Sequence, residues 1–442
     1  MRIWKFAGLL VGAALFAGRA EAVPAFAEQT QQPCSACHVG GFGPQLTPFG
    51  RQFKLEGYTM RAGDTFTLPV SAMAVASFVH TQTDQDEPPA PHYSTNDNAT
   101  LDQVSLFLAG GVGDHFGGFF QATYDGVGRA YSWDNLDLRA ATHENLWDSD
   151  VLLGVSLNNS PGVQDVWNTL AAWGYPYTGS DLAPAPATGT VIDGALAQAV
   201  LGVSAYAYWN SSIYTEVGLY WTPGSGFLKS MGVDPADSGT LKGATPYIRV
   251  AYQKDYGDQN FEIGAYGLFS NIYPGADESA RTADRYSDIG VDASYQFMGD
   301  SSNVYTVNAR YTHEQQYLHA SEILGGAAFA SNRLNDARID LAYSWQSTLG
   351  ATVAAFDTWG SRDPLLYGDN RTFTPDSSGF ILQADYTAFG GADAPLGGRF
   401  NVRVGLQYFI YTKFDGATSN YDGLGHSASD NNTLRLFLWV AL

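Results

Sequence analysis

From residue 64 onward, most of the chain alternates between apolar and polar positions with a period of two. In residues 400–410 every even position is apolar, whereas the odd positions include Asn401, Arg403 and Gln407. Because successive side chains of a strand point to opposite faces, this pattern predicts strands with one apolar and one polar face. A soluble sandwich alternates in the same way, so alternation alone does not decide the fold.

The lengths of the connections between the predicted strands distinguish the two folds. The candidate strands cover residues 65–80, 101–113, 116–126, 133–142, 150–157, 197–209, 212–222, 244–254, 260–272, 284–297, 303–317, 335–347, 350–359, 379–389, 398–412 and 432–442. Links after even-numbered strands are mostly short, and links after odd-numbered strands are mostly long, which is typical of outer-membrane barrels with tight periplasmic turns. The sequence therefore predicts an all-β fold, an antiparallel transmembrane β-barrel of about 16 strands over residues 65–442.

The amino terminus predicts export. Arg2 and Lys5 precede an apolar run over residues 6–17, and Ala20 and Ala22 offer small residues for cleavage, so residues 1–22 are interpreted as a signal peptide. The formal charge is −21, and it becomes −23 without this segment, which carries three basic residues and one acidic residue. This acidity argues against nucleic acid as a partner and favours the attraction of cations, although it also serves as ordinary solubility charge.

The strongest chemical signal is the pentapeptide Cys34-Ser35-Ala36-Cys37-His38. Two thiols at this spacing can bond to the vinyl groups of one haem, and the adjacent imidazole can bind its iron. A disulfide, a redox dithiol or half of a zinc site would not explain the histidine, and zinc would need further close ligands. Cys34 and Cys37 are the only cysteines in the chain. The motif predicts one covalent haem c, held by Cys34, Cys37 and His38.

Residues 23–62 form a segment too short for an independent cytochrome core, so the haem and the barrel lumen are expected to complete it. Within it, Thr47 can cap a helix, Pro48 suits the first helical position and Gly57 suits the stop. These residues predict a short helix at about 48–56, in a small haem-binding segment that precedes the barrel.

The second axial ligand is open at this point. Met60 is the nearest thioether after His38 and is the candidate for the metal site, with Met73, His80, His92, water or an open position as alternatives. A His/Met pair would give a higher reduction potential than a His/His pair. Six arginines fall on the predicted lumen face and could pair with haem propionates or with inward acids, or could simply form a porin-like charge ladder. They are Arg139, Arg249, Arg310, Arg338, Arg403 and Arg435.

The haem motif, together with the following segment from Pro44 to Tyr58, resembles the fused monohaem cytochrome–porin family of the bacterial outer membrane, which includes iron-oxidising members. The resemblance is close in the haem segment and only architectural in the barrel. It implies a small haem segment on the periplasmic side of the barrel or within its lumen. Electrons would pass from an extracellular donor, most concretely ferrous iron, to a periplasmic carrier such as a soluble cytochrome.

A redox conduit of this kind would not need the substrate pocket of an ordinary enzyme. Two other functions are alternatives to it. One is a diffusion porin or solute transporter whose haem is regulatory or sensory. The other is a peroxidase-like haem enzyme, for which the sequence offers no convincing distal acid–base group. The outer loop at 81–100 carries Asp84, Asp86 and Glu87, which could gather ferrous iron by charge. The long loop that begins at Leu157 has no assigned chemistry and is expected to narrow the pore.

Overall fold

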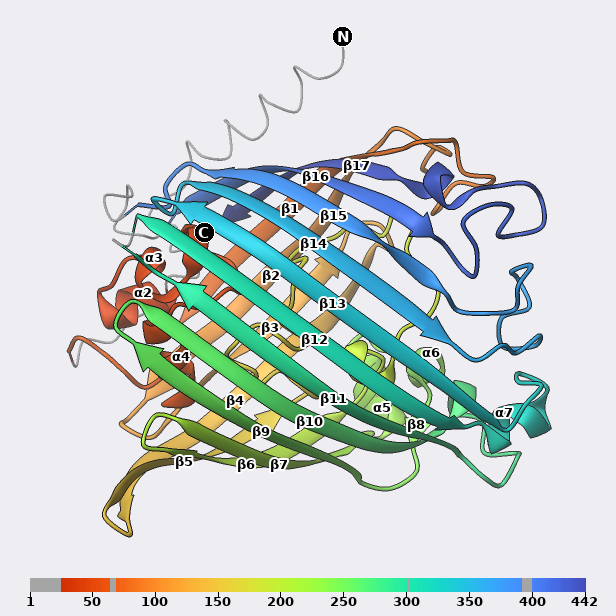
Figure 1. Ribbon diagram of the computed structural model, residues 1–442. Coiled ribbons are helices and arrows are strands. Elements are labelled where there is room, and N and C mark those ends of the chain that lie inside the picture. Colours follow the sequence, from red (N-terminus) through yellow and green to blue (C-terminus); the bar gives the residue numbers. More distant parts are fainter. Residues whose placement is uncertain (1–24, 64–68, 300–301, 392–399) are drawn as a thin grey trace.

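The computed structural model describes residues 25–63, 69–299, 302–391 and 400–442. The predicted signal peptide lies outside these ranges. The described strands form one antiparallel sheet that closes on itself, because β1 pairs with β2 on one side and with β17 on the other. Figure 1 shows the resulting barrel with strongly tilted strands.

Within the described residues, sixteen long strands and the two-residue strand β8 make up the sheet. Their bounds are β1 Val70–Thr81, β2 Asn98–Val112, β3 Phe116–Asp125, β4 Ala130–Leu146, β5 Ser149–Asn158, β6 Leu201–Trp209, β7 Ile213–Trp221, β8 Thr240–Leu241, β9 Thr245–Tyr256, β10 Gln259–Tyr273, β11 Asp284–Phe297, β12 Asn303–Tyr317, β13 Ser331–Trp345, β14 Leu349–Gly360, β15 Ser377–Thr387, β16 Asn401–Lys413 and β17 Thr433–Ala441. Each long strand overlaps one of the sixteen predicted segments. The predicted barrel is therefore confirmed.

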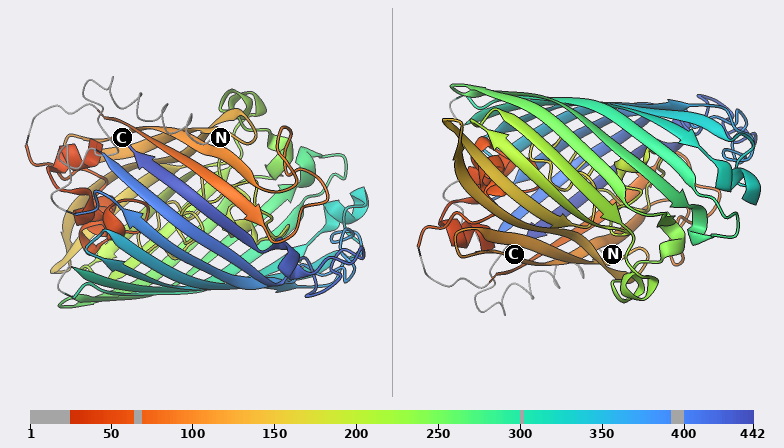
Figure 2. Two further views of the ribbon diagram at one scale, coloured as in Figure 1. Left: turned by 90° about the horizontal axis from the view of Figure 1, so that it is seen from above. Right: turned by 90° about the horizontal axis from the view of Figure 1, so that it is seen from below.

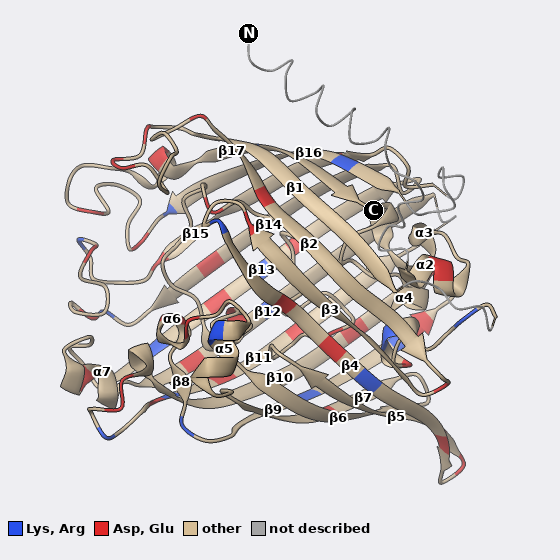
Figure 3. Cartoon of the chain, turned by 180° about the vertical axis from the view of Figure 1, so that it is seen from behind, with Lys and Arg blue, Asp and Glu red and all other residues tan. Residues whose placement is uncertain are grey.

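Residue parity along the strands also follows the prediction. Val404 and Leu406 on β16 are exposed on the outer surface, whereas Arg403 and Gln407 are buried toward the lumen. A lipid-facing surface must be apolar because the bilayer core offers no hydrogen-bond partners. Figure 3 shows the charged residues placed along the strands and in the loops. Among the described residues, no helix is long and apolar enough to cross a bilayer.

Short helices lie at both ends of the barrel. The α-helices are α2 Ala25–Thr30, α3 Cys34–Cys37, α4 Pro48–Leu55, α5 Ser225–Ser230, α6 Pro235–Ser238 and α7 His319–Leu324, and the 3-10 turns are η1 Val39–Gly41, η2 Val191–Asp193, η3 Pro274–Ala276 and η5 Ala428–Asn431. Helices α2, α3 and α4 gather at the end of the barrel where the chain's last strand finishes, as both views of Figure 2 show. Helices α5, α6 and α7 belong to the loops at the opposite end.

Helix α4 forms where the sequence predicts it. The Thr47 side chain accepts a hydrogen bond from the Gly50 amide at 3.1 Å, and Gly57 has a φ of +70° after the last turn. A side chain at position 50 would meet the Cys37 carbonyl oxygen, because a Cβ atom there would lie 2.2 Å from it. Glycine at this position therefore lets α4 pack directly against the Cys34–Cys37 turn.

The long loop at 159–200, between β5 and β6, folds back into the lumen instead of extending into solvent. Its Gln164 side chain donates to Tyr220 on β7 at 2.7 Å, and its Trp167 indole donates to Gln253 on β9 at 2.7 Å. Both contacts are buried. The loop thus fills the space above the amino-terminal helices, as expected for a segment that narrows the pore.

The orientation of the barrel can be tested by labelling. We expect a cysteine introduced by Leu424→Cys, in the exposed β16–β17 loop, to react with a membrane-impermeant maleimide in intact cells. Asp258→Cys, in the tight β9–β10 turn, is expected to react only after the outer membrane is permeabilised, because short turns of such barrels face the periplasm. The unsubstituted protein gives the background. Equal labelling at both positions in intact cells would contradict this orientation.

Candidate cofactor site in the barrel lumen

The Cys34–His38 motif lies on the wall of a cavity inside the barrel. The cavity has a volume of about 380 Å³, which is within the range of roughly 300–1,000 Å³ found for cofactor and ligand sites. Cys34, Cys37 and His38 all line it. Its other walls come from α2, α4, the inward loop and barrel strands, and nine of its 31 lining residues are aromatic. The aromatic lining residues are Phe26, Phe42, Phe53, Tyr58, Phe107, Phe119, Trp173, Tyr177 and Trp439.

The motif has a local structure that presents its three side chains together. Residues 34–37 form the single-turn helix α3, and the His38 amide donates to the Cys34 carbonyl at 2.9 Å. The chain then turns and pairs with the next segment, because His38 and Leu46 form an antiparallel bridge. The Thr47 hydroxyl adds a bond to the Ala36 carbonyl at 2.5 Å. The turn, the bridge and α4 therefore hold one compact unit.

Burial sets the protonation states of the motif. It raises the pKa of Cys34 to about 11 and that of Cys37 to about 12, so both remain neutral thiols until they react. Burial also lowers the pKa of His38 to about 4, although the Gly43 backbone opposes this shift. The histidine is thus neutral near pH 7, which is the form that binds a metal. Its Nδ1 atom is buried and makes no hydrogen bond within the part of the chain described here.

These observations fit a haem. Two thiols and a neutral imidazole lie on one wall of a cavity of suitable size, and the aromatic walls can cover a flat apolar ring. Met60, the sequence candidate for the second axial ligand, is not among the lining residues. Its backbone carbonyl accepts a hydrogen bond from Gln29 at 2.8 Å. Met73, on β1, does line the cavity.

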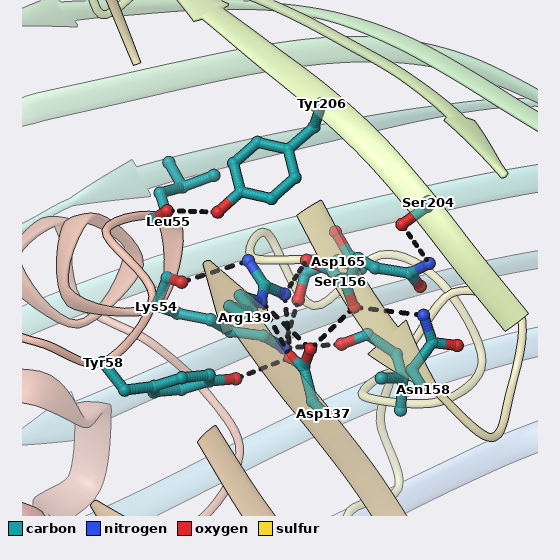
Figure 4. A network of polar contacts seen from close by, with 12 residues as sticks. Lys54, Leu55, Tyr58, Asp137, Arg139, Ser156, Asn158, Asp165, Ser204 and Tyr206 are labelled. Atoms are coloured by element: carbon teal, nitrogen blue, oxygen red, sulfur yellow. Dashed lines mark hydrogen bonds and ion pairs between the residues drawn. The ribbon is translucent and has the colours of Figure 1, made fainter. Parts of the chain in front are cut away.

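The haem segment is fixed to the barrel by a buried polar network, which Figure 4 shows. Arg139 on β4 pairs with Asp137 at 2.9 Å and also donates to the carbonyls of Lys54 in α4 and Gln164 in the inward loop, both at 3.1 Å. The Tyr58 hydroxyl donates to Asp137 at 2.7 Å. One arginine therefore holds the segment, the loop and the wall together.

Lys54 joins the haem segment to the inward loop. Its ammonium group donates to the carbonyls of Val163 and Asp165 at 2.7 and 2.8 Å and lies 4.6 Å from the centre of the Trp173 ring. Burial lowers the pKa of Lys54 to about 7, and the nearby Arg139 acts in the same direction. This lysine also lines the cavity. An anionic group of a cofactor bound beside this lysine would favour its protonated form.

Most of the predicted lumen arginines are buried. Arg139, Arg249, Arg310, Arg403 and Arg435 are each less than a tenth exposed, whereas Arg338 is half-exposed. The described contacts of the buried ones are with lumen carboxylates, backbone carbonyls, aromatic rings, and threonine and glutamine side chains. Arg403, for example, donates to the carbonyls of Gly40 and Phe42, both at 2.8 Å. These arginines therefore bind the inserted segments to the wall, which sequence parity alone did not reveal.

A second, polar cavity of about 160 Å³ lies next to the first. The two share Asn168, Ala171, Gly174 and Pro176 as lining residues, so this stretch of the inward loop separates them. Arg310 and Asp193 form an ion pair at 2.7 Å in the wall of the polar cavity. Side chains that an open channel would leave in water, such as Gln407 and Arg435, are fully buried. The inserted segments fill the lumen at this level.

The outer loops bring together three groups that the sequence did not connect. Asp86 of the first loop lies 3.6 Å from the His426 ring, and Asp422 accepts a hydrogen bond from the same ring at 2.5 Å. Each offers an atom within 4.8 Å of the others. Asp84, the neighbour that the sequence grouped with Asp86, instead accepts a bond from Asn96 at 3.1 Å.

Comparison with known proteins finds similarity only in the fold of the barrel. No family model and no curated protein sequence matches the chain. Solved outer-membrane proteins resemble it in fold, with TM-scores below 0.5. The outer membrane channel DcaP of Acinetobacter baumannii has 14% identity and a TM-score of 0.47, covering 87% of this chain and 99% of its own. OprB of Pseudomonas putida has 13% identity and a TM-score of 0.47, covering 84% and 93%. OmpT of Vibrio cholerae has 10% identity and a TM-score of 0.42, covering 84% and 97%.

These similarities concern barrel architecture. They leave the resemblance of the amino-terminal segment to cytochrome–porins as a prediction. The chain thus forms a closed β-barrel of the outer-membrane type, with an amino-terminal segment and one long loop inside its lumen.

Proposed function

We propose that this protein is an outer-membrane electron conduit that binds one haem c in the lumen cavity. The observation that carries the proposal is the position of Cys34, Cys37 and His38, side by side on the wall of an aromatic cavity. A bound haem would supply a ferric/ferrous couple that takes up and releases single electrons. Extracellular ferrous iron is the most concrete donor, and a periplasmic electron carrier such as a soluble cytochrome is the acceptor.

The chain's own residues have three tasks in this proposal. The two thiols bond to the haem edge, and the neutral His38 ring binds the iron. The aromatic walls exclude water and so favour the less charged, reduced state of a buried haem iron. The protonated form of Lys54 adds a positive charge beside the cavity, which acts in the same direction. Fixation by Arg139 keeps the cavity in one place, so that electron transfer needs no rearrangement of the segment.

The alternative is a solute channel with a regulatory or sensory haem. The barrel architecture supports this alternative, because proteins of similar fold include the channel DcaP. The buried lumen around Gln407 and Arg435 favours the conduit, since free diffusion needs a continuous aqueous path. In planar bilayers, we expect the conduit to show little steady conductance, and a large open-channel conductance would favour the alternative.

The deciding experiment mixes the oxidised, purified protein with ferrous iron in a stopped-flow instrument. We expect the haem absorption bands to change to those of the reduced form, because one electron leaves each ferrous ion and enters the haem. Dithionite serves as the control that reduces the haem without iron. If dithionite reduces the haem fully and ferrous iron does not, then iron is not the donor.

A further inference from the structure

We propose that Met73, on strand β1 of the barrel, supplies the second axial ligand of the haem iron, opposite His38. This inference rests on the proposed function and deepens it. The haem would then join the amino-terminal segment to the barrel wall, since its two axial ligands would come from these two parts of the chain. Its coordination would be complete only when the segment is seated in the lumen.

The candidate ligands differ in whether they line the cavity. Met73 lines the same cavity as Cys34, Cys37 and His38, whereas Met60, His80 and His92 do not. The His80 ring instead pairs with Asp97 at 2.7 Å and is about half exposed. His92 belongs to the outer loop between β1 and β2. The backbone carbonyl of Met60 accepts a hydrogen bond from Gln29.

Met73 is held in place by the barrel itself. It pairs with Ala441 of β17 and with Ser105 of β2, at the seam where the barrel closes. Met73 and Cys34 pack against the same buried cluster, which includes Phe42 and Trp439. Met73 and Cys34 thus adjoin the same buried cluster and the same cavity, and Met73 is carried by a strand of the barrel wall.

Other donor groups of the cavity are engaged or unsuitable. Lys54 donates to two carbonyls. Asp165 accepts three backbone amide bonds at 2.9–3.1 Å and pairs with Arg249. Asp134 accepts bonds from Gln121 and Thr123, both at 2.8 Å. Burial raises the pKa of Tyr177 well above its usual range, so it remains a phenol, which binds ferric iron weakly.

A thioether at this position has a chemical consequence. Methionine is a softer ligand than histidine and stabilises ferrous relative to ferric haem, which raises the reduction potential. A higher potential favours the uptake of electrons from a weak donor such as ferrous iron. The barrel strand would therefore help to set the driving force for the electron transfer.

The test compares Met73→Leu with the matched control Met60→Leu, both as full-length, haem-loaded proteins. Leucine keeps a similar volume, so the strand and its packing should survive. In the ferric protein, thioether ligation gives a weak charge-transfer band at the red end of the visible spectrum. We expect Met73→Leu to lose this band and to have a lower reduction potential, with its covalent haem content unchanged. Met60→Leu should match the unsubstituted protein.

Retention of the band and of the potential in Met73→Leu, or their loss in Met60→Leu, would overturn the proposal. X-ray absorption at the iron edge of the unsubstituted protein gives a check that needs no variant. It should detect one sulfur atom bonded to iron, and bound haem without that sulfur would overturn the Met73 assignment alone. Absence of covalent haem from the unsubstituted protein would overturn the proposed function, and the ligand with it.

Discussion

Replacing both Cys34 and Cys37 with alanine is expected to abolish covalent haem attachment. The physical reason is that these are the only two thiols in the chain, so no other side chain can form the thioether bonds. Haem staining after denaturing gel electrophoresis, where only covalently bound haem remains, measures the loss. The barrel should still form, because the two substitutions leave its strand pairing intact. A heat-dependent change in gel migration reports on that folding.

The control for this experiment is Ser35→Ala, which lies between the two cysteines and leaves both thiols in place. We expect it to stain as strongly as the unsubstituted protein. Covalent haem in the double variant would contradict the proposed attachment, and an unsubstituted protein without any haem would contradict the cofactor itself.

The second large effect is expected at Arg249, on strand β9. Its guanidinium group lies 3.1 Å from Asp165 of the inward loop, 2.5 Å from Asp292 and 3.6 Å from Glu262, and all four residues are buried. Arg249→Leu would leave three buried carboxylates without this cation. Removing one partner of a buried ion pair typically costs about 3–5 kcal/mol, so we expect a loss of that size in the free energy of unfolding.

Urea unfolding in lipid vesicles, followed by tryptophan fluorescence, measures this loss. The matched control is Arg333→Leu, an exposed arginine on β13, for which we expect a change within about 0.5 kcal/mol. Because Asp165 anchors the inward loop, the Arg249 variant should also conduct ions more readily. A variant as stable as the control would show that this network does not hold the loop in place.

Local sequence was sufficient for the elements of the barrel. The alternation that places Val404 outside and Arg403 inside follows from strand geometry, and it needs no knowledge of the neighbouring strands. The helix that starts at Pro48 was also predictable, because its cap at Thr47 and its stop at Gly57 act within a few residues. These features could be predicted because the interactions that form them join residues close together in the sequence.

The packing of the segments inside the lumen could not be predicted from local sequence patterns. Arg139 was predictable as an inward side chain, but its bonds to Lys54 and Gln164 link residues 85 and 25 positions apart in the chain. No periodic pattern encodes such pairs. The predicted lumen could equally have been a hydrated channel lined with charge, and only the folded positions of the two inserted segments show that five of its six predicted arginines are buried.

The sequence by itself determined the class of fold and the haem motif, because strand alternation and the Cys34–His38 spacing are local. Only the tertiary structure decided what surrounds that motif. Closure of the barrel brings β1 beside β17, and this places Met73 next to the cavity while Met60, nearer in sequence, lies outside its wall. The physical reason is that a cavity is made by packing between distant segments, so proximity along the chain does not measure proximity to it.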